Sequence, residues 1–278
     1  MAMRTIGARE LATESARLLS ALRVQRPLVQ AITNYVSMDI AANVLLAIGA
    51  SPAMVHAAEE AEEFVGFAGA LVVNIGTLSP SFVPGMEIAA AAASRLGKPW
   101  VLDPVGAGAT SYRNRVVDQL LRFRPSIIRG NASEIIAVAR IAGVDVETAR
   151  PKGVDSAHGV DQARDAAIVL ARRLDCVVAA TGAIDFVTDG ERVAEPANGA
   201  ELMTRVTAVG CALSGVVAAF AALTPDRFLA AAAATAIYGV AGEMSAERAK
   251  GPGAFRVAFL DALDAIDEAD IARRLKVA

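Results

Sequence analysis

The chain has 278 residues, enough to bury one large hydrophobic core. Hydrophobic residues make up 54% of it, charged residues 21% and aromatic residues 5%, a composition too apolar for a disordered protein. The formal net charge is -3 with both signs interspersed, which gives no cationic field for nucleic acid or an anionic membrane. We therefore expect one domain over residues 1-278 that binds a small molecule, with no nucleic-acid or membrane partner.

The longest apolar stretches run from Cys211 to Leu223 and from Leu229 to Gly242. Each is shorter than the roughly 18 residues of a membrane span, so both predict buried helices. The N-terminal segment lacks the apolar core of a secretory signal, which favours a cytoplasmic protein. The two cysteines, Cys176 and Cys211, have neither metal-ligand nor disulfide spacing, and we expect free thiols.

Apolar runs of strand length alternate with segments of helical period, the pattern of βα units around a mainly parallel sheet. The predicted strands are Leu28 to Ile32, Ala70 to Asn74, Pro99 to Asp103, Ser126 to Arg129 and Cys176 to Ala180. Phe186 to Val193 has Asp-Gly between β-prone residues and predicts a hairpin. Arg150 to Val160 is predicted to be a loop insertion, and Asp261 to Ala278 has the spacing of a surface helix.

Small residues from Val206 to Gly215 lead into a predicted helix. A helix N-terminus offers unpaired N–H groups and a positive dipole end, which hold a phosphoryl group and would lower the pKa of Cys211. The alternative is structural, with Gly210 allowing close backbone contact and Cys211 acting as a small buried hydrophobe. The segment taken alone leaves both interpretations open.

Polar side chains follow successive predicted strands. Asp103 and Arg129 end two of them, Asn131 and Glu134 begin the next helix, and Thr181 follows a third strand. A turn after Asp103 and a capping box between Asn131 and Glu134 would explain these residues without a ligand. Because parallel strands bring their carboxyl ends to one edge, however, the residues converge, which favours a site for a nucleotide with Mg²⁺. An arginine at the end of an apolar strand also suits a phosphate.

Other catalytic patterns are missing from the sequence. The only histidines, His56 and His158, have no triad or metal spacing, and we expect surface or loop residues. Lys152 has no Walker sequence around it, and neither a GxGxxG turn nor a protein-kinase motif set occurs. The ordinary P-loop and protein-kinase routes are therefore excluded.

A series of short motifs runs along the chain. They are Pro27-Leu28-Val29, Ile32 to Val36, Ala42-Asn43, Leu45 to Met54, Asn74 to Leu78, Leu102 to Thr110, Arg129 to Glu134, Lys152 to Asp155 and Gly251 to Gly253. In this order they resemble the motifs of the hydroxyethylthiazole kinase family in the ribokinase-like superfamily, and the resemblance runs from about Arg23 to about Phe255.

The resemblance implies a phosphotransferase that uses ATP and Mg²⁺. The acceptor would be the hydroxyl of 4-methyl-5-(2-hydroxyethyl)thiazole, in thiamin salvage or biosynthesis. The resemblance also implies a ribokinase-like α/β fold with a mainly parallel central sheet flanked by helices. It further implies a homotrimer with the site near a subunit interface.

The resemblance assigns roles to residues by position. The implied catalytic residues are Gly210 and Cys211. The implied ATP-binding residues are Arg129, Thr181 and Asn131. The implied substrate-binding residues are Asn34, Met54 and Ala208. The implied magnesium ligands are Asp103 and Glu134.

Three positions depart from the family pattern. Ala208 and Val209 replace the Gly-Thr or Gly-Ala that often precedes the Gly-Cys pair, and a positive φ at position 208 would be unfavourable for alanine. Gln30 stands where many relatives place histidine. Cys211 falls where related sugar kinases keep an aspartate base, and a thiol with a reference pKa of about 8.5 is an unusual base.

Two other functions fit part of the same pattern. A different ribokinase-like enzyme, such as a hydroxymethylpyrimidine kinase or a nucleotide-dependent dehydratase, usually carries an acidic residue at this helix start, so Cys211 argues against it. A non-catalytic regulator would bind a nucleotide or a thiazole without turnover.

Overall fold

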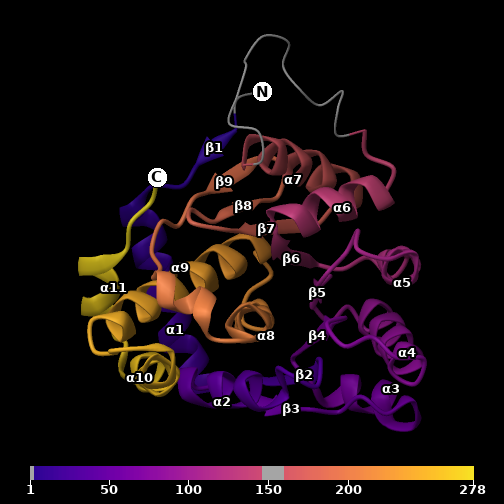
Figure 1. Cartoon of the computed structure of the whole chain (residues 1–278), viewed down its shortest axis with the longest axis horizontal. Coiled ribbons are helices and arrows are strands. Elements are labelled where there is room, and N and C mark those ends of the chain that lie inside the picture. Colours follow the sequence, from indigo (N-terminus) through magenta and orange to yellow (C-terminus); the bar gives the residue numbers. More distant parts are fainter. Residues whose placement is uncertain (1–2, 146–159) are drawn as a thin grey trace.

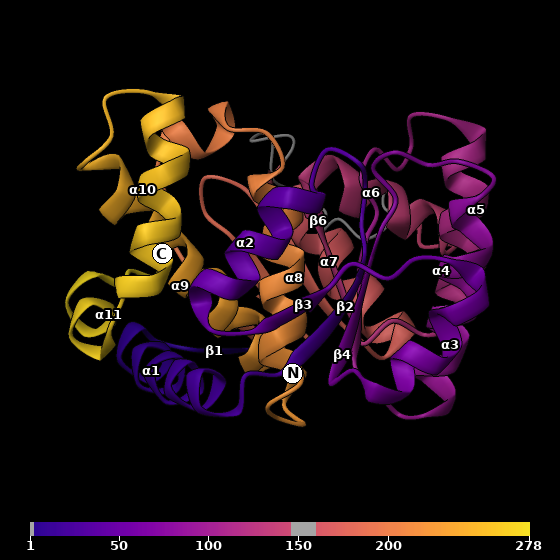
Figure 2. The ribbon, with the colours of Figure 1, turned by 90° about the horizontal axis from the view of Figure 1, so that it is seen from below.

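The computed structural model describes residues 3–145 and 160–278, and a nine-stranded sheet lies between two layers of helices (Figure 1). In spatial order the strands are β1 (Arg4–Thr5), β9 (Arg192–Ala194), β8 (Phe186–Thr188), β7 (Val177–Thr181), β6 (Ile127–Asn131), β5 (Trp100–Asp103), β4 (Ala70–Asn74), β2 (Leu28–Ile32) and β3 (Ser51–Ala53). One face packs on α1 (Ala8–Gln25), α2 (Met38–Ile48), α8 (Val209–Ala221), α9 (Arg227–Ala246), α10 (Pro252–Ala265) and α11 (Glu268–Arg274). The other packs on α3 (Ala58–Phe67), α4 (Phe82–Arg95), α5 (Ser111–Leu121), α6 (Ala132–Ile141) and α7 (Val160–Leu174) (Figure 2).

The predicted mainly parallel sheet is confirmed. β2 and β4 have the predicted bounds, while β5, β6 and β7 each begin one residue later than predicted. β6 also ends at Asn131 and β7 at Thr181, so the predicted ends at Arg129 and Ala180 are wrong and Arg129 lies within its strand. The late hairpin is also confirmed, because β8 pairs antiparallel with both β7 and β9. The sequence analysis missed β1 and β3, which have two and three residues and are too short to show a hydrophobic period.

The predicted C-terminal helix is wrong in its bounds. α10 ends at Ala265, and α11 begins at Glu268 after Asp267, whose side chain accepts a hydrogen bond from Asp270 N at 2.8 Å and caps the new helix. Ile266 between them is fully buried, so this segment also contributes to the core. The predicted loop from Arg150 to Val160 lies outside the described residues except for Val160, which begins α7.

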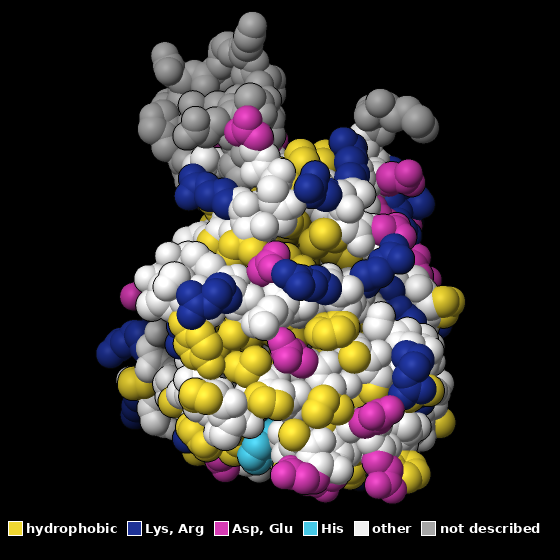
Figure 3. Space-filling view, turned by 90° about the vertical axis from the view of Figure 1, so that its right-hand side faces the viewer, with side chains coloured by type: hydrophobic (Ala, Val, Ile, Leu, Met, Phe, Trp, Pro, Cys, Tyr) yellow, Lys and Arg dark blue, Asp and Glu magenta, His cyan; other side chains and the backbone are white. Residues whose placement is uncertain are grey.

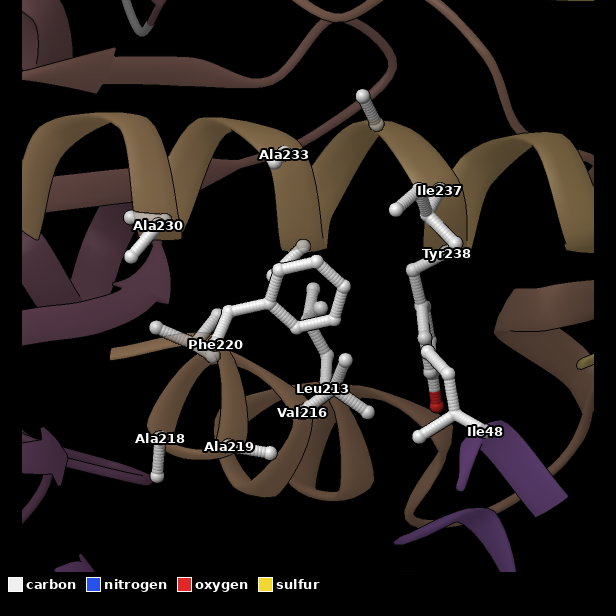
Figure 4. Close-up of a cluster of buried hydrophobic side chains, with 14 of the residues drawn as sticks. Ile48, Leu213, Val216, Ala218, Ala219, Phe220, Ala230, Ala233, Ile237 and Tyr238 are labelled. Atoms are coloured by element: carbon white, nitrogen blue, oxygen red, sulfur yellow. The ribbon is translucent and has the colours of Figure 1, made fainter. Parts of the chain in front are cut away.

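Helices α8 and α9 form the centre of the larger core and confirm the two predicted buried helices (Figure 4). The alanine-rich faces of the two helices let their backbones approach closely, and Phe220 and Tyr238 fill the space that remains. α9 is the one helix among the described residues long and apolar enough to cross a membrane, but 89% of its apolar window is buried inside the structure. Its apolar surface therefore faces the core.

Parallel strands buried on both faces bring their carboxyl ends to one edge of the sheet. Residues of β2, β4 and β5 alternate between the two cores, which fixes the direction of each polar residue that ends a strand. On the face that Figure 3 shows, hydrophobic side chains are interspersed with charged ones, with Lys and Arg mainly in the upper half of the view and Asp and Glu mainly along its lower edge. The polar residues that end β4 and β5 therefore lie at the carboxyl edge of the sheet.

Candidate active site

The N-terminus of α8 lies at the carboxyl edge of the sheet and begins with a left-handed residue. Ala208 has φ 62° and ψ 8°, the conformation that the sequence analysis identified as unfavourable for alanine at this position. The first hydrogen bond inside the helix is donated by Ala212 N to Ala208 O at 3.0 Å. The N–H groups of Val209, Gly210 and Cys211 come before it and have no acceptor within the helix. Tyr238 fixes this turn by donating its hydroxyl to Val209 O at 2.7 Å.

Arg129 ties this helix start to the sheet. Its Nη1 donates to Gly210 O at 2.9 Å and its Nη2 donates to Thr181 Oγ1 at 2.6 Å, while Nε is buried without a partner. A methyl group on Gly210 would lie 3.3 Å from Nη1, tighter than an ordinary contact, so glycine allows the close approach. The structure thus brings Arg129 and Thr181 together, as the convergence of strand ends predicted, and adds Gly210 to them.

Asp103 lies beside this guanidinium, with 3.9 Å between its Oδ2 and Arg129 Nη1. Asn74 Nδ2 and Ser214 Oγ both donate to Oδ2 at 2.7 Å, whereas the buried Oδ1 has no hydrogen-bond partner. Burial raises the pKa of Asp103 to about 6, although Arg129 and the hydrogen bond from Ser214 oppose that shift. The carboxyl group therefore titrates close to neutral pH.

Cys211 joins the same polar network through two asparagines. Asn34 Nδ2 donates to Asn74 Oδ1 at 2.8 Å and lies 3.5 Å from Cys211 Sγ. The prediction that the helix start lowers the pKa of Cys211 is wrong, because burial and the Asp103 carboxylate raise it above its ordinary value. At neutral pH the thiol is protonated, and this part of the network links Cys211 to Asp103.

Asn131 and Glu134 form the capping box that the sequence analysis offered as the alternative to a ligand site. Asn131 Oδ1 accepts from Glu134 N at 3.0 Å, and Glu134 Oε2 accepts from Asn131 N at 2.8 Å. The other carboxylate oxygen, Oε1, accepts from Gly106 N at 2.9 Å, so Glu134 also holds the turn after β5. Glu134 is buried, and its charge acts on Asp103 by raising the pKa of that group. The Glu134 side chain therefore belongs both to the capping box of α6 and to the site.

Among residues 3–145 and 160–278, no group of three or more histidine, cysteine or carboxylate side chains could hold a metal ion alone. Mg²⁺ is usually bound by one or two carboxylates together with substrate phosphates, so a larger protein cage is not needed. Asp103 supplies a buried carboxylate with a free Oδ1, and Glu134 supplies a second nearby charge. This donor set fits a magnesium ion shared with a phosphate.

Met54 and Asn34 lie on the β2 and β3 side of the site. Met54 follows β3 and packs against the core cluster that contains α8. Gln30, the family departure, is buried in β2 and donates Nε2 to Val55 O at 3.2 Å. Gln30 thus holds the segment that carries Met54. His56 stacks on Phe82 with 4.5 Å between the ring centroids, and His158 and Lys152 lie outside the described residues.

A cavity of about 710 Å³ opens beside the α8 N-terminus. Its walls come from Arg129 and the Thr181-Gly182 turn on one side and from the 198–204 segment and α9 on the other. Asp185 also lines it, accepts from Gly182 N at 2.9 Å, and has its pKa raised to about 6 by burial, against the opposing effects of that bond and of Arg129. The volume and the mixed polar lining suit a nucleotide-sized ligand.

Four residues of this site received no role in the sequence analysis. They are Asn74, Ser214, Asp185 and Tyr238. Asn74 ends a predicted strand just as Asp103 does, and that position is the signal that could have identified it. Asp185 and Tyr238 gave no such signal, because their roles depend on which turn and which helix pack against the site.

The cavity at the sheet edge is lined by the helix N-terminus and the buried Arg129, and the Asp103 carboxylate lies 3.9 Å from that guanidinium. This is an α/β protein whose sheet edge suits a phosphorylated ligand. The comparisons with known proteins narrow this class. Residues 19–269 match the model of the hydroxyethylthiazole kinase family. The chain belongs to that family.

Individual relatives agree with this assignment. A hydroxyethylthiazole kinase from Rhizobium leguminosarum bv. trifolii (strain WSM2304) is 54% identical over 266 residues, covering 95% of this chain and 97% of that protein. The structure of a hydroxyethylthiazole kinase protein from Pyrococcus horikoshii OT3 superposes with a TM-score of 0.88 at 41% identity, covering 96% of this chain and 98% of that one. An ADP complex of Bacillus subtilis pyridoxal kinase has a TM-score of 0.52 at 16% identity over 77% of this chain and 91% of that one. The last likeness concerns the fold alone, and the fold is the predicted ribokinase-like one.

The raised pKa of Asp103 makes a prediction about stability. A carboxyl group with a folded-state pKa above its unfolded value stabilises the fold at low pH, and this contribution is lost as the pH rises through about 6. We expect Asp103→Asn, which does not titrate, to exceed the wild type in free energy of unfolding at pH 8 by up to about 3 kcal/mol. The difference should shrink towards pH 4 in urea titrations. A pH-independent difference, or a less stable variant at pH 8, would contradict the assignment.

Proposed function

We propose that the chain transfers the terminal phosphate of ATP to the hydroxyl of 4-methyl-5-(2-hydroxyethyl)thiazole, as family membership and the anion-binding helix start together support. The observation that carries the proposal is Arg129, held between Gly210 O and Thr181 Oγ1 beside the unpaired N–H groups of α8. Phosphoryl transfer depends on positioning and charge neutralisation more than on covalent chemistry. This site supplies both.

On the donor side, ATP would occupy the cavity of about 710 Å³. Arg129 and Thr181 would contact its phosphates, with Asn131 at the adjacent start of α6. The backbone from Ala208 to Cys211 would cradle the phosphoryl group in transfer, since three N–H groups there lie outside the helical ladder. Tyr238 and the left-handed Ala208 hold this turn in place.

For the metal, Asp103 and Glu134 are the residues that would hold Mg²⁺ together with phosphate oxygens. Asp103 offers Oδ1, while its Oδ2 is oriented by Asn74 and Ser214. When bound, Mg²⁺ neutralises charge on the phosphates. Arg129 balances the buried carboxylate at 3.9 Å in the protein alone.

On the acceptor side, Asn34 and Met54 would line the thiazole pocket, with Ala208 at its border. Asn34 Nδ2 lies 3.5 Å from Cys211 Sγ, which places a polar donor beside the thiol. The acceptor hydroxyl would lie near this pair and face the α8 N-terminus. Gln30 supports the segment carrying Met54 through Val55 O.

Cys211 has the role of an orienting group in this proposal. Its pKa is raised by burial and by Asp103, so the thiolate is scarce at neutral pH. A catalytic base typically contributes 100-fold to 10,000-fold, as an order of magnitude. We therefore assign the acceleration mainly to the charged groups and the helix N-terminus.

The remaining proposals concern assembly and location. We propose one catalytic domain, a homotrimer and a cytoplasmic enzyme. Tyr35 and Val36 support an interface near the site, because both follow Asn34 directly and expose 63% and 56% of their surface. Large apolar side chains exposed together in this way are typical of surfaces that another subunit covers.

The function is tested by measuring ADP release with ATP, Mg²⁺ and a panel of small alcohols. We expect the thiazole alcohol to give turnover and hydroxymethylpyrimidine to give at least tenfold less. Glu134→Gln should lose at least tenfold in kcat, because it removes a charge next to Asp103 and puts an NH2 group in place of one of the two oxygens that accept from Gly106 N and Asn131 N. Binding without turnover in the wild type would favour the regulator, and full activity of Glu134→Gln at saturating Mg²⁺ would contradict the metal assignment.

The role of Cys211 makes a separate prediction. Cys211→Ala should reduce kcat by less than about tenfold with little change in KM, because a protonated thiol supplies no base. Cys211→Asp should retain activity, since a carboxylate can accept the proton at this position. A 100-fold or larger fall in kcat for Cys211→Ala would show that the thiol itself takes the proton.

A further inference from the structure

Arg113 lies on the first turn of α5 and is not part of the site described above. Its guanidinium nevertheless hydrogen-bonds to the two turns that follow β4 and β5. Nη1 donates to Ile75 O at 2.6 Å and to Val105 O at 2.8 Å, and Nη2 donates to Gly76 O at 2.8 Å. The Ile75 and Gly76 carbonyls belong to the turn after β4, and the Val105 carbonyl belongs to the turn after β5. One side chain therefore joins the two turns.

Each of the two peptide groups that bond to Nη1 also bonds to a residue of the site. The Ile75 carbonyl and the Gly76 N–H are one peptide group, and Gly76 N donates to Asn74 Oδ1 at 2.9 Å. The Val105 carbonyl and the Gly106 N–H are another, and Gly106 N donates to Glu134 Oε1 at 2.9 Å. The positive charge thus polarises two peptide groups whose N–H ends point at Asn74 and Glu134.

The placement of this charge is otherwise unfavourable. A cation in the first turn of a helix opposes the helix dipole, and none of the carboxylates in the described residues lies within 4.0 Å of Arg113 in an ion pair. Gly106 has φ +71°, a conformation that favours glycine, and a methyl group there would make only an ordinary contact with Arg113 Cδ at 3.5 Å. Three backbone carbonyls are the partners that hold the guanidinium.

We propose that Arg113 is a positioning residue for phosphoryl transfer, which orients Asn74 and Glu134 through the Ile75-Gly76 and Val105-Gly106 peptide groups. Asn74 in turn donates to Asp103 Oδ2 at 2.7 Å, so the effect reaches both carboxylates of the site. Arg113 touches neither nucleotide nor alcohol. The catalytic part of this inference rests on the proposed function. The hydrogen bonds from Arg113 to the two peptide groups are a property of the ligand-free protein.

The kinetic test compares Arg113→Met with the wild type and with Arg115→Met, an exposed arginine of the same helix. We expect Arg113→Met to lose at least tenfold in kcat per folded molecule with the KM for ATP changed less than threefold, and Arg115→Met to stay within twofold. In combination with Glu134→Gln, the loss should be smaller than the product of the two single losses, because both variants act on the Val105-Gly106 peptide. An Arg113→Met kcat within threefold of the wild type, or additive losses in the double variant, would overturn the proposal.

Amide hydrogen exchange gives a readout without substrate or metal. In ligand-free Arg113→Met we expect at least tenfold faster exchange at Gly76 and Gly106, with the amides of α9 unchanged. Wild-type exchange at both glycines would overturn the proposal.

If the methionine variant does not fold, Arg113→Lys replaces it, because one ammonium cannot span three carbonyls as the planar guanidinium does. The lysine variant should lose at least threefold in kcat and protection at one or both glycines, and wild-type values for both would overturn the proposal. A wild type inactive on the thiazole alcohol would refute the proposed function alone, and the exchange rates would still decide on Arg113.

Discussion

The site depends on one guanidinium, that of Arg129, which joins three elements that are distant in the sequence. Through Gly210 O it fixes the start of α8, through Thr181 it fixes the end of β7, and at 3.9 Å it faces the Asp103 carboxylate at the end of β5. Because the donors of a buried guanidinium need partners on several sides, the start of α8 and the two neighbouring strands must form together. The same contact explains the glycine at 210, where a side chain would press on Nη1.

Several features of this edge are unfavourable in the free protein. Ala208 is left-handed, burial raises the pKa of Asp103 to about 6, and both Asp103 Oδ1 and Arg129 Nε are buried without partners. Strain and unsatisfied groups persist where the surrounding structure over-determines them, and here the buried α8 and α9 pair provides that support. A phosphate and its metal would satisfy the groups that the fold leaves open. The same unpaired groups that lower the stability of the free protein are thus the groups available to a ligand.

The five main parallel strands were predicted because each is a mainly apolar run that ends in a polar residue or is followed by one. The positions of Asp103, Arg129 and Thr181 at one edge followed from parallel pairing alone, and the structure places them together. The pKa of Cys211 could not be predicted in this way, since a helix start was considered without the burial and the Asp103 charge that outweigh it. Arg113 was equally hidden, because its partners are backbone carbonyls that leave no mark in the sequence. Local pattern identifies which residues reach the edge, while tertiary packing decides their protonation and their partners.

We infer that Arg129 and the α8 N-terminus bind the terminal phosphates of the nucleotide. The most direct measurement is calorimetric titration of a non-hydrolysable ATP analogue and of AMP into the wild type and into Arg129→Met. Loss of a buried charged contact typically costs 2 kcal/mol or more, as an order of magnitude. We expect Arg129→Met to lose at least 30-fold in affinity for the ATP analogue and to change less than threefold in affinity for AMP. Equal losses for both nucleotides, or an unchanged affinity for the ATP analogue in a folded variant, would contradict it.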